Sequence, residues 1–271
     1  MVNRQYTACD PGVEEMFWRH RTYTPEVLGA ADLHLHTRAS DGLVAARDLV
    51  DFVEVATNLD LIAITDHDET SASLEAREWA ARQGYRVAVV PGVEVTTLDG
   101  HLLALFIDER PPAWRSLQHT AEWVRTRGGL CVAPHPFTRW THSLHRRALA
   151  QAIAADLITG VEVLNASLAG RGSRPHALRL AREHGLAEIG ASDAHMTSMV
   201  GLARTRFPGR TAEDLRRAIE ASTTQPEGRF ATPAEMAAEA IPQLARSMVH
   251  LPLRRIVRYA RSRRLPNARS L

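Results

Sequence analysis

The chain has 271 residues, of which 45% are hydrophobic and 24% charged, a composition typical of a globular protein with a substantial core. No stretch approaches the roughly 18 apolar residues of a membrane span, and segment 1–20 lacks the apolar run of a signal peptide. Two cysteines, Cys9 and Cys131, are too few for a disulfide framework. These features argue against an exported or membrane protein and favour a cytoplasmic location.

Charge is distributed unevenly, although the formal net charge is only +2. Beyond Glu239 the chain has eight arginines and no acidic residue, whereas the preceding part has 25 basic against 31 acidic residues. Such a tail is suited to a nucleic acid, to a membrane surface, or to packing on the acidic body of its own chain. Within it, Leu253, Ile256, Val257 and Ala260 share a helical face, which favours packing.

Apolar periodicity and turn residues predict strands and helices that alternate along most of the chain. The expected strands, which begin with the one carrying His34 and His36, include 61–65, 86–95, 101–107, 130–133, 160–164, 187–192 and 202–207. The expected helices are 43–57, one capped by Thr70 or Ser71 and ended by Gly84, 114–127, 146–155, 175–184, and one capped at Thr211. A turn at Asp99-Gly100 replaces one crossover by a hairpin. We expect an α/β barrel over residues 31–225, between a leader (1–30) and a basic helical tail (226–271).

Side chains of metal-ligand type recur directly after predicted strands. His34 and His36 alternate with Leu33 and Leu35, so in a strand the two imidazoles project from one face and the leucines from the other. Further side chains of this kind at strand ends are His67, Glu94, His135, Asp193 and His195. In an α/β barrel these positions converge on the C-terminal face, where such folds place their active sites. The pattern predicts a metal centre there.

Five motifs within residues 31–210 resemble, in chain order, those of the polymerase and histidinol phosphatase (PHP) superfamily. They are His34-Leu35-His36 with Ser40-Asp41-Gly42, Thr65-Asp66-His67-Asp68, Pro91-Gly92-Val93-Glu94, Pro134-His135-Pro136 and Ser192-Asp193-Ala194-His195. The resemblance implies a distorted barrel of seven strands and two or three divalent ions, which His, Asp and Glu ligands allow to be manganese, zinc or iron.

Carried over by motif, the resemblance assigns nine side chains to these ions. One ion takes His34, His36, Glu94 and Asp193; Glu94 bridges to a second ion bound by His101 and His135; a third is held by Asp41, His67 and His195. Asp41 stands where some relatives have histidine. The short interval between Glu94 and His135 leaves little room for the inserted lid domain of one branch of the superfamily.

The expected activity is hydrolysis of a small phosphate mono- or diester, such as a nucleotide, an oligonucleotide end or a sugar phosphate, by a metal-bridging hydroxide. Asp193, His195 and Asp68 are candidates for assisting proton movement, and Arg139, Arg171 and Arg174 for binding phosphate. Two alternatives remain open. Some compact relatives hydrolyse carbamate or aryl esters, and a non-catalytic metal-binding module could use the basic tail to bind a polyanion.

Overall fold

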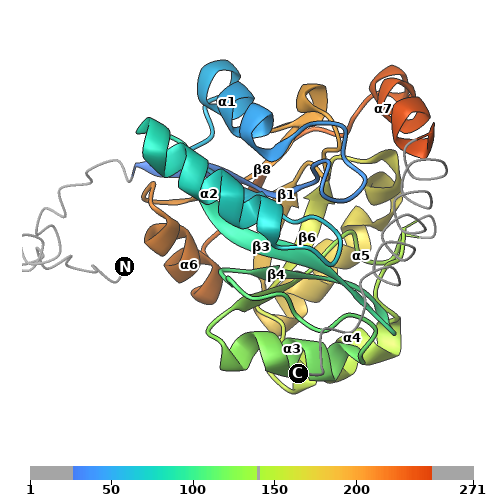
Figure 1. Cartoon of the computed structure of the whole chain (residues 1–271). Helices are drawn as coiled ribbons and strands as arrows, with labels where there is room; N and C mark the ends of the chain where they lie inside the picture. The colour runs from blue at the N-terminus through green and yellow to red at the C-terminus, as the bar shows by residue number, and fades with distance from the viewer. Residues whose placement is uncertain (1–26, 139–140, 246–271) are drawn as a thin grey trace, which may run out of the picture.

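The computed structural model describes residues 27–138 and 141–245, in which a curved sheet is surrounded by helices (Figure 1). The strands are β1 (Leu28–Leu35), β2 (Leu61–Ile64), β3 (Ala88–Thr97), β4 (Gly100–Leu105), β5 (Leu130–Ala133), β6 (Gly160–Asn165), β7 (Ala187–Ala191), β8 (Ala203–Pro208) and β9 (Gln225–Gly228). The helices are α1 (Ala46–Ala56), α2 (Ser71–Gln83), α3 (Leu117–Thr126), α4 (Arg146–Ala154), α5 (Leu168–His184), α6 (Ala212–Glu220) and α7 (Pro233–Ala245), with a short 3₁₀ turn at Thr197–Met199.

The strands lie in the order β7-β6-β5-β4-β3-β2-β1-β8-β9. Strands β1, β2 and β3 pair in parallel, as do β5, β6 and β7, whereas β4 is antiparallel to both of its neighbours. The sheet curves until the end of β7 meets β1, where His36 N–H donates to Ala194 O at 2.9 Å. This nearly closed sheet confirms the expected α/β barrel. Strands β1 to β7 supply its seven strands, and β8 and β9 extend the sheet beyond β1.

The barrel interior is filled by alternate residues of successive strands, among them Leu33, Leu61, Leu103, Val132 and Ile189. Helix α6 packs against the same cluster through Leu215 and Ile219. A second cluster lies under α1 and α2, and a third under α3, α4 and α5. The large buried area stabilises the barrel mainly by the hydrophobic effect and leaves the strand ends free to carry polar groups.

Strand β1 differs from the regular alternation expected for it. Leu33 lies in the barrel interior, but Leu35 packs in the cluster under α1 and α2, so the two leucines do not share a face. The pairing of β1 with β2 shifts between Asp32 and Leu35, as in a β-bulge, which re-aims the side chains that follow it. The expectation that His34 and His36 lie side by side is confirmed, with ring centroids 5.0 Å apart.

Two helix starts also differ from expectation. Thr70 makes no side-chain cap; Glu69 Oε1 instead accepts hydrogen bonds from the N–H groups of Thr70 and Ser71, both at 3.0 Å. Helix α5 begins at Leu168 rather than at Pro175, because the Ser167 side chain caps it by accepting from Gly170 N–H. As predicted, Gly84 ends α2. The capping box at Thr211 starts α6, also as predicted.

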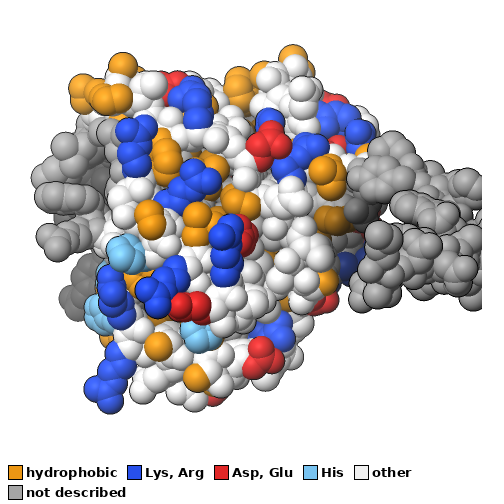
Figure 2. Space-filling model, turned by 180° about the vertical axis from the view of Figure 1, so that it is seen from behind, with side chains coloured by type: hydrophobic (Ala, Val, Ile, Leu, Met, Phe, Trp, Pro, Cys, Tyr) orange, Lys and Arg blue, Asp and Glu red, His pale blue; other side chains and the backbone are white. Residues whose placement is uncertain are grey.

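The expected domain boundaries fall inside strands, since β1 begins at Leu28 and β9 spans the boundary at residue 226. Cys131 is buried in β5, while Cys9, Arg139 and the tail beyond residue 245 lie outside the described residues. On the face shown in Figure 2, basic side chains are interspersed with acidic and apolar ones. Among the described helices, none is long and apolar enough to cross a membrane.

Candidate metal centre

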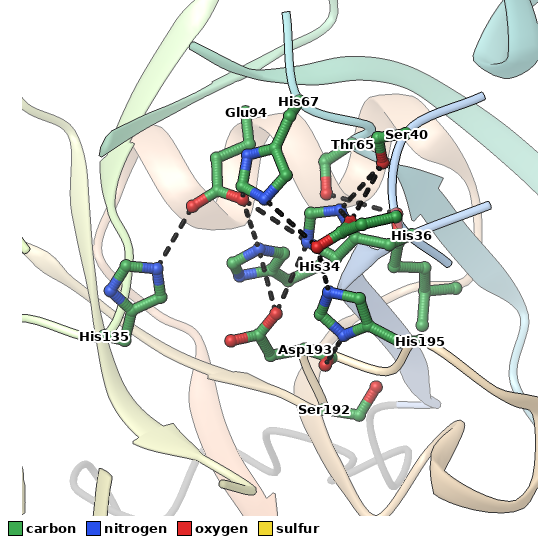
Figure 3. Close-up of polar contacts among 12 residues, drawn as sticks. His34, His36, Ser40, Thr65, His67, Glu94, His135, Ser192, Asp193 and His195 are labelled. Carbon is green, nitrogen blue, oxygen red and sulfur yellow. Dashed lines mark hydrogen bonds and ion pairs between the residues drawn. The ribbon is translucent and has the colours of Figure 1, made fainter. Parts of the chain in front are cut away.

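All nine predicted ligands come together at the C-terminal end of the parallel strands. His34 lies on β1, Glu94 on β3 and His101 on β4, and the other side chains extend from the segments that follow β1, β2, β5 and β7: His36, Asp41, His67, His135, Asp193 and His195. Figure 3 shows the rings of His34, His36, His67 and His135 gathered around the Glu94 carboxylate. Sequence-distant residues therefore form one continuous cluster, as the strand-end positions predict.

Glu94 lies at the centre, and its two carboxylate oxygens face different sets of imidazoles. Oε1 lies 2.8 Å from His101 Nδ1 and 3.1 Å from His135 Nε2. Oε2 lies 3.3 Å from the Nε2 atoms of both His34 and His36, and 3.2 Å from His67 Nδ1. A carboxylate whose oxygens serve two ligand sets has the geometry of a bridging ligand, which agrees with the role that the resemblance gives to Glu94.

Two further carboxylates complete the cluster. Asp193 Oδ1 is 3.4 Å from the Nε2 atoms of His34 and His36, beside Glu94. Asp41 Oδ2 is 3.3 Å from His195 Nε2 and 3.8 Å from His67 Nε2, on the other side of His36. The His36 and His195 rings stack, with centroids 4.3 Å apart. The carboxylates and imidazoles thus fall into overlapping groups: His34 and His36 lie with Asp193 as expected, whereas His36 also joins His67 and Glu94 in one group and Asp41 and His195 in another.

The cluster is buried, so its charges interact strongly. Burial alone would lower the pKa of His34, but Asp193, Glu162 and Glu94 outweigh burial and raise it well above its usual value. Burial likewise opposes protonation of His36, yet Asp193 and Glu94 raise its pKa to about 10. The surrounding imidazoles, in turn, hold the pKa of Glu94 well below its usual range against the effect of burial. Cations are therefore favoured at this position, and a divalent ion competes with protons for it.

The donor set and two unpaired nitrogens fit divalent ions. Buried His36 Nε2 and His67 Nδ1 make no hydrogen bond to any described residue, although both lie close to Glu94. Buried polar atoms normally have partners, and those without one call for an explanation. Four sets of three His, Asp or Glu side chains could each hold an ion, because the three ligand atoms within a set lie within 4.8 Å of one another. These residues are suited to hold divalent metal ions, in agreement with the prediction.

Glu162 supports the site and was not among the predicted residues. Its Oε1 lies 2.7 Å from His34 Nδ1, and its Oε2 accepts from the His135 N–H at 2.7 Å and from Asn165 Nδ2 at 3.0 Å. A carboxylate on the far nitrogen of a ligating histidine orients the ring and sets its tautomer. A single acidic residue within the apolar strand 160–164 is the sequence signal that could have identified it.

Asp66 holds the loop that carries Asp41 and was also missed. Its Oδ1 accepts from the N–H groups of Thr37 and Ser40 at 2.7 and 3.1 Å and from Ser40 Oγ at 2.6 Å, while Oδ2 accepts from Thr37 Oγ1 at 2.6 Å. These donors surround a fully buried carboxylate. Asp66 is therefore a structural clamp that places Asp41 beside His36.

The backbone is strained at several of these positions. His135, Asp193 and Asp68 have positive φ angles of 29°, 56° and 51°. Residues other than glycine seldom adopt this conformation, and such strain clusters at functional sites. At His135 the flanking prolines restrict the chain, as the sequence indicated, and the Glu162 carboxylate holds the His135 N–H.

Among the described residues, the other predicted side chains are not part of the ligand groups. Asp68 Oδ1 accepts from Thr96 N–H at 2.7 Å, so its carboxylate holds the end of β3. Arg171 lies over the Phe230 ring, with 5.2 Å between the guanidinium carbon and the ring centroid. Arg174 Nε is buried without a hydrogen-bond partner among the described residues. The structure gives no contact of Arg171 or Arg174 with the described cluster, and Arg139 is not described.

Comparisons with known proteins agree with this fold. A family model described as PHP-associated matches residues 173–224. The chain is 34% identical over 147 residues to protein MJ1587 of Methanocaldococcus jannaschii, covering 50% of this chain and 81% of that one. It is 41% identical over 104 residues to the 5′-3′ exoribonuclease Rnm of Salmonella typhimurium, which covers 36% of this chain and 35% of the relative. The chain thus spans about a third of the length of that enzyme.

A solved structure extends the similarity of the fold. A two-domain protein from Bacteroides vulgatus, described as containing a PHP-like metal-dependent phosphoesterase, superimposes with a TM-score of 0.63 at 22% identity, covering 75% of this chain and 65% of that one. The fold and cluster define an α/β barrel whose clustered His, Asp and Glu side chains are suited to bind divalent metal ions. Together with the sequence relatives, they show that the chain belongs to the PHP superfamily, as the five motifs predicted.

Proposed function

We propose that this chain is a metal-dependent phosphoesterase that hydrolyses a phosphate mono- or diester of a nucleotide or an oligonucleotide end. The observation that carries the proposal is Glu94, whose two oxygens face separate histidine sets within a buried cluster of nine ligand-type side chains. The similarity to an exoribonuclease supports a nucleotide or oligonucleotide substrate. Divalent ions held by this cluster would supply a nucleophile at neutral pH and neutralise charge on phosphate oxygens.

Neighbouring residues hold the ligand side chains in the orientations that phosphate-ester hydrolysis needs. Glu162 orients His34, and Asp66 places the loop of Asp41. His195 Nδ1 lies 3.0 Å from the Asp193 carbonyl oxygen, which favours a proton on Nδ1 and leaves Nε2 facing Asp41. We propose three ions, bound as the motifs assign them, and His195 and Asp193 as the candidates for proton transfer. The contact of Asp68 with Thr96 favours a structural role for that residue.

An assay panel tests this function. The purified chain, loaded in turn with manganese, zinc and iron, is offered aryl phosphate mono- and diesters, nucleoside phosphates, 5′-phosphorylated oligoribonucleotides, and aryl carbamates. We expect turnover of phosphate esters that a chelator abolishes and that His34→Ala lowers by at least about a hundredfold, because His34 lies beside both Glu94 and Asp193. Glu227→Gln, which changes an exposed ion pair on β9, is the matched control and should retain full activity.

Carbamate hydrolysis without phosphate-ester hydrolysis at every metal loading would overturn the proposal. Metal binding without turnover of any ester would also count against it and would favour a binding module.

A further inference from the structure

Helix α7 brings one residue to the metal centre that none of the motifs contains. Gln243 Nε2 donates a hydrogen bond to Asp41 Oδ2 at 3.2 Å, across 202 residues of sequence. Helix α7 lies beside the loop that follows β1 (Figure 1). The contact therefore joins the C-terminal helix to the carboxylate of the third predicted ligand set.

The two oxygens of Asp41 have different partners. Oδ1 accepts from Ser40 Oγ at 3.2 Å and lies 3.6 Å from His36 Nδ1. Oδ2 is the oxygen that faces the His195 and His67 imidazoles, at 3.3 and 3.8 Å, and it is the one that Gln243 contacts. Ser40 and Gln243 thus hold the carboxylate from its two sides. The amide of Gln243 restrains the oxygen that would bind an ion together with His67 and His195.

Several contacts place α7 so that Gln243 can reach Asp41. Ala231, just before the helix, is fully buried, and its N–H donates to Ala166 O at 2.7 Å. Thr232 and Glu235 cap the first turn, and Arg229 pairs with both oxygens of Glu235 at 2.9 and 2.7 Å. Met236 packs against the cluster under α1 and α2. A helix anchored at its start delivers a side chain eight residues beyond Glu235 at about 12 Å along its axis.

We propose that Gln243 is a positioning residue that determines how tightly the Asp41, His67 and His195 site retains its ion. The inference rests on the proposed ligand assignment. Partners of metal ligands set the direction and basicity of those ligands, and losing one typically weakens metal binding by about ten- to a hundredfold. Through Gln243, the position of α7 controls the occupancy of one ion site and leaves the Glu94-bridged pair unaffected.

The test is manganese titration of the full chain, followed by calorimetry and elemental analysis. Gln243→Met keeps the side-chain length and removes the donor, and we expect one of the three manganese affinities to fall about tenfold while the other two stay unchanged. The matched control is Ile241→Ala on the same helix, because Ile241 is 73% exposed and away from the contact. The control should bind all three ions as the wild type does. The melting temperature of the metal-free protein should be the same for both variants, which a merely structural role of Gln243 would not allow.

Unchanged affinities in Gln243→Met would overturn the inference, as would equal weakening of all three sites or a wild-type chain that binds fewer than three ions. Failure of the proposed function is distinguishable: a wild type that binds three ions but hydrolyses no phosphate ester would refute the activity, while the titration alone would still decide the role of Gln243.

Discussion

Glu162 connects three parts of the site through its two oxygens. It contacts the ring of His34, the backbone of His135 and the amide of Asn165, which itself donates to Asp193 Oδ2 at 3.2 Å. Strands β1, β5, β6 and β7 are thereby tied to one another at the level of the metal centre. At the scale of single residues, the ligands depend on buried partners that hold their rings and backbone in place.

We expect Glu162→Gln to weaken binding of the ion at His34 by about ten- to a hundredfold, because the neutral amide is a poorer acceptor for the His34 ring. Isothermal titration with manganese measures the change, and circular dichroism checks that the fold persists. Glu227→Gln again provides the control. An affinity within twofold of the wild type would show that Glu162 does not orient His34.

The two ends of the first motif should have separable effects. His34 faces Glu94 and Asp193, whereas Asp41 Oδ2 faces His67 and His195. We therefore expect His34→Ala to lose the ions that share Glu94, and Asp41→Ala to lose mainly the third ion. Elemental analysis of both purified variants measures the stoichiometry. Equal loss of every ion from both variants is the result that would contradict this assignment.

At the scale of elements, α7 is held by a charged cap that is open to solvent. Glu235 accepts hydrogen bonds from Arg229 and from Thr232, and these contacts, led by the Arg229 side chain, lower its pKa from 4.5 to about 2. Because the folded-state pKa is the lower one, the carboxylate contributes stability that is complete above pH 4.5 and is lost as the pH falls toward 2. The attachment of α7 should weaken in that range.

We expect the wild type to protect the α7 amides against hydrogen exchange better than Glu235→Gln does above pH 4.5, because the variant has no carboxylate at any pH. This difference in protection should disappear as the pH falls toward 2. The effect should shrink at high salt, because the pair is exposed and screened. Asp214→Asn, which removes the equivalent cap of α6, should change exchange in α6 alone. Identical pH profiles for the wild type and Glu235→Gln would refute the role of this cap.

At the scale of the molecule, the sequence predicted the barrel and the clustering of strand-end polar side chains because both follow local rules. Apolar runs mark strands, and a polar residue such as His67 or His135 directly after a run must lie at the C-terminal face. The bulge in β1 was not predictable, since it depends on the pairing of that strand with β2. The partnership of Glu162 with His34 depends on which strands become neighbours, and the contact of Gln243 with Asp41 depends on how the C-terminal helix docks. Local patterns carry no information about either.

The apolar core and the metal ligands are formed by different residues, and this separation determines how metal removal affects stability. The three large apolar clusters include none of the predicted ligands, so the metal-free chain should stay folded. Each ion at about a hundred times its dissociation constant adds about 2.7 kcal/mol to the folded state. For a chain of this size, the loss of each such ion on chelation should lower the melting temperature by roughly 5 to 11 °C. Calorimetry before chelation, after it, and after manganese is restored measures the shift. Elemental analysis confirms that the chelated protein has lost its ions. If its melting temperature is nevertheless unchanged, the folded chain binds the ions no more tightly than the unfolded chain does, which would contradict a preformed site.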